Sequence, residues 1–276
     1  MQKPVWRKNK NTNFNSRSGG APACQTSASM TRTDLKALLS PAERRLFARL
    51  DTAQKIQDFL DRLPANFELD GDTMMSPRAM LKAGVAHCAE AAIFAAAALR
   101  FHGHPAWLLD IQARPTDHDH VVTLFKQHEL WGAISKTNHA ILRWRDPIYK
   151  TPRELAMSYA HEYCLPSGRK SMLAFSRPFS LDRYAPKEWV TTTDDLHWLV
   201  DALDESPHIP LAPPRSLRAR RRSAKIELIA QEHVEWPDPR KKKARKNSPP
   251  LVPVKVGTQR RRAKLKGTAR FPLSRA

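Results

Sequence analysis

The sequence predicts an α+β domain in which one central, buried helix packs against an antiparallel sheet. Residues 88–101 are the least polar stretch of the chain and are apolar nearly all round, which is typical of a helix at the centre of a domain. Short runs with strand character follow it, and helices with capping residues lie before and after those runs. This order differs from the regular strand-helix alternation of a doubly wound parallel sheet.

Three helical segments are expected before the central helix. Ser40-Pro41-Ala42-Glu43 combines a capping Ser, a Pro at the first helical position and a Glu at the third, and so predicts a helix that runs to Leu50. Residues 52–63 predict a second helix. Ser76-Pro77 opens a third, shorter one that ends before Gly84.

Strands and two further helices are expected after the central helix, which Gly103 ends. The strands are short apolar runs bounded by Pro, Asp, His or Asn, at residues 106–111, 121–125, 130–134 and 141–144. Thr151-Pro152-Arg153-Glu154 is a second capping box and predicts a helix over residues 155–163. Residues 192–203 predict a last helix, because their leucines and valine fall on one helical face.

Charge divides the chain into three parts. The net charge of +20 is unevenly spread: residues 1–33 hold six basic and no acidic residues, residues 34–204 are almost neutral, and residues 205–276 hold 20 basic against five acidic residues. Only the middle part has the size and apolar content of a folded domain. We therefore expect a disordered basic arm over 1–33, a domain over 34–204 and a disordered polycationic tail over 205–276.

Several classes of protein are excluded by composition. No stretch approaches the length of a membrane span and no apolar signal region opens the chain, so we expect a cytoplasmic protein without membrane contact. Three widely spaced cysteines, Cys24, Cys88 and Cys164, do not form a disulfide framework or a metal-binding pair. With nine glycines in the whole chain, a glycine-rich phosphate loop is not expected.

Cys88 is the candidate nucleophile. It stands where a loop meets the start of the predicted central helix, and there the free backbone N–H groups and the helix dipole favour a thiolate. The same N–H groups could stabilise an oxyanion beside the sulfur. His120 is the candidate base, because it opens the apolar run at residues 121–125, a rigid strand that can pack beside the helix. His118 is its rival.

The segment Gly84-Val85-Ala86-His87-Cys88-Ala89-Glu90-Ala91-Ala92, its Ala-rich continuation, His120-Val121-Val122 and Trp131 together resemble the transglutaminase-like superfamily. The resemblance covers about residues 76–164. It implies a papain-like fold, with Cys88 as the nucleophile at the start of a central helix and His120 as the base on an adjacent strand. The family pattern commonly has an Asp four residues after the Trp, where this chain has Ser135.

The third member of the site is therefore open between three residues. Asp146 is preferred, since an anion both orients an imidazole and stabilises the imidazolium, while Asn138 and Ser135 are the alternatives. A metal site could be formed by Asp117-His118-Asp119-His120 with His102 and His104. We interpret the segment as a polar loop instead, because no spaced second pair of ligands is evident. No metal or cofactor is expected, and no calcium loop is present.

The expected function is that of a thiol enzyme acting on amide bonds of a protein or peptide, by hydrolysis or acyl transfer. The alternative is a catalytically inactive interaction module of the same fold. In that case the basic tail would carry the function by binding nucleic acid, non-specifically, or another acidic partner.

Overall fold

The computed structural model describes residues 32–241 and has mixed α and β structure built around one open antiparallel sheet. Of the described residues, 32–237 belong to one compact unit. The last described residues belong to a second unit and include the short 3₁₀ helix η2 (Pro239–Lys241). Among the described residues, no helix is both long and apolar enough to cross a membrane.

The predicted central helix is confirmed as α5, Cys88–Phe101. Every residue from Ala89 to Phe101 is buried, and the many alanines let the sheet approach the helix closely. Strand β2 (His120–Gln127) packs on it, and the Thr123 hydroxyl donates to the Ala92 carbonyl at 2.6 Å. The start of α5 is therefore held at a fixed place beside the sheet.

The sheet has seven strands, in the order β4-β3-β2-β1-β5-β7, with β6 also pairing with β1. The other strands are β1 (Trp107–Ala113), β3 (Leu130–Ile134), β4 (Arg145–Tyr149), β5 (Met172–Ser176), β6 (Phe179–Ser180) and β7 (His208–Pro210). In the β1–β2 pair, Ile111 lies opposite His120 and Asp110 opposite Val121. In the β2–β3 pair, Thr123 lies opposite Ile134.

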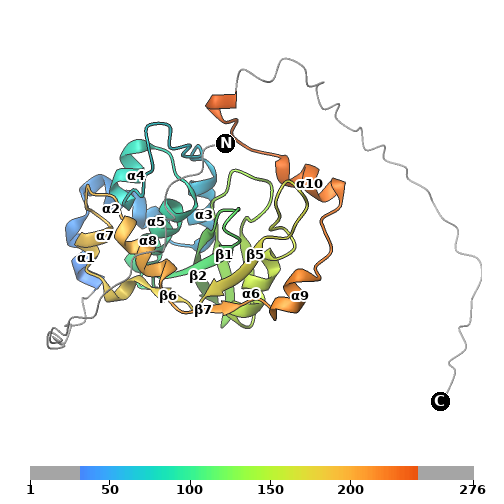
Figure 1. Cartoon of the computed structure of the whole chain (residues 1–276). Coiled ribbons are helices and arrows are strands. Elements are labelled where there is room, and N and C mark those ends of the chain that lie inside the picture. Colours follow the sequence, from blue (N-terminus) through green and yellow to red (C-terminus); the bar gives the residue numbers. More distant parts are fainter. Residues whose placement is uncertain (1–31, 242–276) are drawn as a thin grey trace, which may run out of the picture. The chain divides into compact units, whose positions relative to one another are not determined.

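Helices cover both faces of the sheet (Figure 1). The face that carries α5 also packs the helices that share its apolar core, which are α1 (Arg32–Leu38), α2 (Pro41–Arg49), α3 (Ala53–Asp61), α4 (Pro77–Ala83), α7 (Pro186–Trp189) and α8 (His197–Asp204). The short 3₁₀ helix η1 (Leu181–Arg183) precedes α7. A second core on the opposite face involves α6 (Pro152–Tyr159) and α9 (Pro214–Arg218).

The capping box predicted at Ser40 is present, whereas at Thr151 only the cap is formed, because Glu154 accepts from the Lys150 N–H at 2.8 Å. Ser40, Thr52, Ser76 and Thr151 each accept a hydrogen bond from the third residue of the following helix. The last predicted helix starts later than expected, at His197. Asp195 and Leu196 before it bond to the backbone of Met74 instead of opening a helical turn.

The strand predicted over residues 141–144 is wrong, and β4 begins only at Arg145. Leu142 has φ +60°, in the left-handed region, which no strand residue adopts. Its N–H donates to Glu162 at 2.7 Å and its carbonyl accepts from Ser135 at 2.5 Å. These two bonds make residues 141–144 a tight loop against the end of β3.

The boundary predicted at residue 204 is also too early. Strand β7 pairs with β5, α9 contributes to the second core, and α10 (Lys225–Glu232) forms within the short apolar segment of the predicted tail. Arg220 donates to the carbonyls of Met172 and Lys170, so part of the basic character serves to satisfy backbone acceptors. Most of the predicted arm over 1–33, and the tail from residue 242 onward, lie outside the described residues.

Candidate active site

Cys88 is the first residue of α5 and a free, half-buried thiol. His87 caps the helix, with its Nδ1 at 3.2 Å from the Ala89 backbone nitrogen. At this position the first N–H groups of the helix have no carbonyl four residues earlier within it. A negative charge on the sulfur, or on an oxygen bound next to it, is therefore favoured.

A fully buried carboxylate fixes the loop that precedes Cys88. Glu90 accepts from the backbone N–H groups of His87 at 2.9 Å and Met75 at 3.1 Å, and from the Thr73 hydroxyl at 3.0 Å. The Asn66 side-chain amide adds a further bond at 3.1 Å. Because four donors from three separate segments converge on one side chain, Glu90 ties residues 66–75 to the start of α5.

Two histidines act on the pKa of the Cys88 thiol. Burial alone raises the pKa of this thiol, but hydrogen bonds with His120 and His87, together with the charges of the two rings, hold the pKa well below the usual range of a cysteine. A cysteine with a lowered pKa carries its charge as thiolate near neutral pH. The ring of His120 thus lies close enough to Cys88 to act on the pKa of its thiol, and its role as the base stays a prediction.

The tautomer of His120 follows from the hydroxyl behind it. His120 Nε2 lies 2.8 Å from Ser135 Oγ, and Ser135 Oγ lies 2.5 Å from the Leu142 carbonyl, which can only accept. The single hydroxyl proton therefore goes to Leu142, and Ser135 accepts from Nε2–H. This leaves Nδ1 as the nitrogen that exchanges a proton with Cys88.

Ser135 is itself held on both sides. Gln57 on α3 accepts from the Ser135 backbone N–H at 2.9 Å and donates from Nε2 to the Ser135 carbonyl at 2.9 Å. Both side chains are buried. A chain of hydrogen bonds thus runs from α3 through Ser135 to His120.

The preferred third residue of the prediction, Asp146, does not lie behind His120. Its carboxylate accepts from the Trp144 indole at 2.8 Å. Asn138, the second alternative, bonds through its side-chain amide to both backbone groups of Trp236, at 2.8 Å each. The expected Asp146 contact is wrong: Ser135, the third alternative, bonds to the ring, and Asp146 is an exposed residue of β4.

The other histidines and cysteines of the prediction lie elsewhere. His118, the rival base, has an exposed side chain, and its carbonyl accepts from Tyr163. His102 lies at the opposite end of α5, where its Nε2 bonds the Phe47 carbonyl at 2.7 Å. Cys164 is buried against Gln231, and Cys24 is outside the described residues.

His87 is a site residue to which the sequence argument gave no role of its own. Burial opposes charge on its ring, but the hydrogen bond with Cys88 and the charge of Glu90 raise its pKa to about 10. Nε2 donates to the Thr73 carbonyl at 3.0 Å. Nδ1 therefore caps the helix when the ring is neutral and donates to the Cys88 thiolate when the ring is charged.

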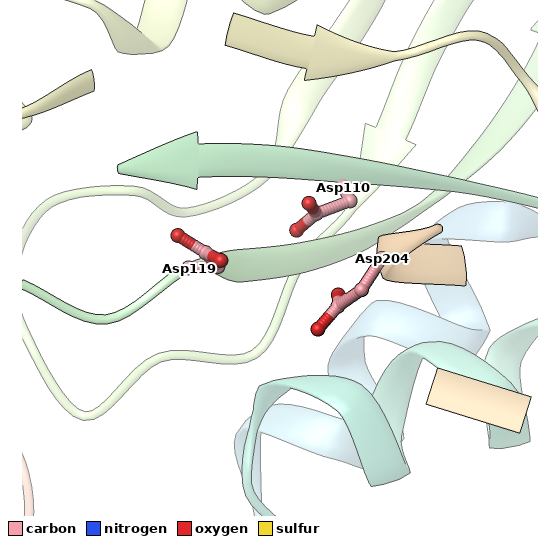
Figure 2. A group of neighbouring side chains, drawn as sticks. All are labelled: Asp110, Asp119 and Asp204. Carbon is pink, nitrogen blue, oxygen red and sulfur yellow. The ribbon is translucent and has the colours of Figure 1, made fainter. Parts of the chain in front are cut away.

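A cluster of three carboxyl groups lies next to this site, and the sequence argument did not bring these residues together. Asp110 comes from β1, Asp119 directly precedes His120, and Asp204 ends α8; one oxygen of each lies within 4.8 Å of the others. Figure 2 shows the three side chains directed toward a common space. The charges of Cys88 and His120 act on the pKa of Asp110, so the cluster adjoins the thiol site. A charged residue within the apolar strand of residues 107–111 was the available signal.

His208 on β7 binds this cluster from the side. Its Nδ1 lies 2.7 Å from the Ser206 carbonyl and its Nε2 lies 2.9 Å from Asp110 Oδ2. Both ring nitrogens of His208 thus face oxygen atoms, and the hydrogen bond with Asp110 raises the pKa of His208. Burial raises the pKa of Asp110 itself. Burial and the charges of Asp110 and Asp119 raise the pKa of Asp204 to about 7.

Comparison with known proteins adds no relative. No model of a known protein family matches the chain, and a search of curated proteins finds no match. The function is therefore argued from the site.

Proposed function

We propose that this protein is a thiol enzyme of the transglutaminase-like, papain-related type that acts on amide bonds of a protein or peptide. The observation that carries the proposal is that the ring of His120 acts on the thiol of Cys88 at the start of a buried helix and lowers its pKa. That ring is held in one tautomer by Ser135. A buried cysteine that serves only in packing is not expected to have two imidazole rings beside it or a lowered pKa.

The chemistry follows from the positions of these groups. The Cys88 thiolate attacks the carbonyl carbon of the amide, and the C=O electron pair moves onto oxygen, where N–H groups at the start of α5 can stabilise it. His120 Nδ1–H then protonates the departing amine as the C–N bond breaks, which leaves a thioester on Cys88. Water or a second amine, deprotonated by His120, attacks the thioester and restores the thiol.

Ser135 in place of a carboxylate changes the energetics of this cycle and keeps its geometry. The hydroxyl orients His120, but it supplies no negative charge to stabilise the imidazolium. We therefore expect a slower enzyme than one with an Asp behind the ring.

The first test is the reactivity of Cys88. Full-length protein is treated with iodoacetamide at pH 6 and labelling of each cysteine is followed by peptide mass spectrometry. Cys88 should react much faster than the same residue in urea, and His120→Ala should remove the difference. Equal rates in the folded and unfolded chain would falsify the proposal.

The second test traps the thioester. The protein is incubated with a peptide digest of an unfolded protein and with hydroxylamine, which attacks thioesters to give hydroxamates. Hydroxamate on glutamine side chains indicates a carboxamide substrate, whereas hydroxamate at new peptide C-termini indicates cleavage. Cys88→Ala is the control. An activated Cys88 that gives no hydroxamate on any peptide would instead favour the inactive interaction module.

A further inference from the structure

The acidic cluster beside the thiol site contains an oxygen that lacks a partner. Asp110 is 1% exposed, and its Oδ2 accepts from His208. Its Oδ1 is buried without a hydrogen-bond partner among the described residues. Leaving a carboxylate oxygen buried and unbonded is costly, and in native folds such atoms commonly bind an ordered water or an ion.

The carboxyl groups around this oxygen indicate which chemical class of ligand would fit. Asp119 and Asp204 place an oxygen within 4.8 Å of that of Asp110, and the three side chains come from a strand, a loop and a helix end. Carboxyl groups this close together repel one another when they are ionised. Carboxylate oxygens are the ligands of hard cations, and a divalent ion would offset this repulsion.

The geometry points to a binding site for a hard divalent cation formed by Asp110, Asp119 and Asp204. Asp204 is half-buried, so the ion can enter from its side, and water can complete the coordination. His208 acts from behind Asp110 and fixes the orientation of its carboxyl group. Because the ligands are separated by up to 94 positions in the chain, no loop motif announces this site.

Binding is tested with Mn²⁺ as a spectroscopic probe. Full-length protein is titrated with Mn²⁺ and the free ion is followed by electron paramagnetic resonance, with Mg²⁺ and Ca²⁺ as competitors. One site per chain is expected. Asp204→Asn and Asp110→Asn should each weaken it at least tenfold, while Asp201→Asn, an exposed acid on the same helix, should not change it.

Two controls separate the possible failures. Cys88→Ala should bind Mn²⁺ as the wild type does, so loss of the enzyme proposal would leave the cation site standing. Circular dichroism of Asp204→Asn checks that the variant is folded. Mn²⁺ binding that is absent, or equally strong in wild type, Asp110→Asn and Asp204→Asn, would overturn the assignment.

Discussion

Removing the Ser135 hydroxyl should lower both the free energy of unfolding and the reactivity of Cys88, because this hydroxyl orients His120. In Ser135→Ala, the His120 Nε2–H and the Leu142 carbonyl both lose their partner. His120 is 5% exposed, so its N–H is left without water. An unsatisfied buried polar group costs about 1–3 kcal/mol, and we expect a loss of about 2–3 kcal/mol in the free energy of unfolding.

The same substitution should reduce the reactivity of Cys88. Once Nε2 is released, the ring can rotate or change tautomer, and the hydrogen bond from His120 to the thiolate weakens. A hydrogen bond to a charged group contributes about 1.5–3 kcal/mol, which corresponds to a rise of about one to two units in the pKa of the thiol. Labelling by iodoacetamide at pH 6 should then slow by about 10- to 100-fold.

Ser76→Ala is the matched control. Ser76 is also a fully buried serine whose hydroxyl accepts from one backbone N–H, that of Ala79 at 3.2 Å, and donates to one carbonyl, that of Thr192 at 2.6 Å. It should lose a similar amount of stability in urea unfolding and keep the Cys88 labelling rate. If both variants lose reactivity equally, or if Ser135→Ala labels like the wild type, the assignment of Ser135 as the residue that orients His120 is refuted.

Three further substitutions test neighbouring parts of the structure. The hydrogen bond with Arg78 lowers the pKa of Glu43 to about 2, so the contribution of this pair to stability is complete above pH 4.5 and is lost as the pH falls toward 2. Because Arg78 is partly exposed, solvent screens the pair, and Glu43→Gln should remove about 1–2 kcal/mol of this acid-sensitive stability. Urea unfolding between pH 2 and 6 measures the loss. His87→Asn keeps a helix cap but removes a hydrogen bond to Cys88, so the pH midpoint of thiol labelling should rise by about one unit, and an unchanged midpoint would show that His87 only caps the helix. Asp146→Ala should leave the labelling rate within about twofold of wild type, because the carboxylate contacts Trp144; a tenfold loss would reinstate it as the partner of His120.

The sequence by itself determined the features that depend on neighbouring residues. Capping boxes and the apolar character of residues 88–101 are local properties, and the helices they predict are present, although the one predicted over residues 155–163 is α6, Pro152–Tyr159. Cys88 at the start of α5 follows from the same local signals. His120 at the start of β2 follows from the apolar run after it.

The tertiary structure alone decided which groups meet. Ser135 reaches His120 because β2 pairs with β3. Its hydroxyl donates to the carbonyl of Leu142, which has a positive φ that no sequence rule anticipates. Asp110, Asp119 and Asp204 come together only through the β1–β2 pairing and the packing of α8. Such contacts depend on register and packing between segments distant in the chain, and local propensity does not encode them.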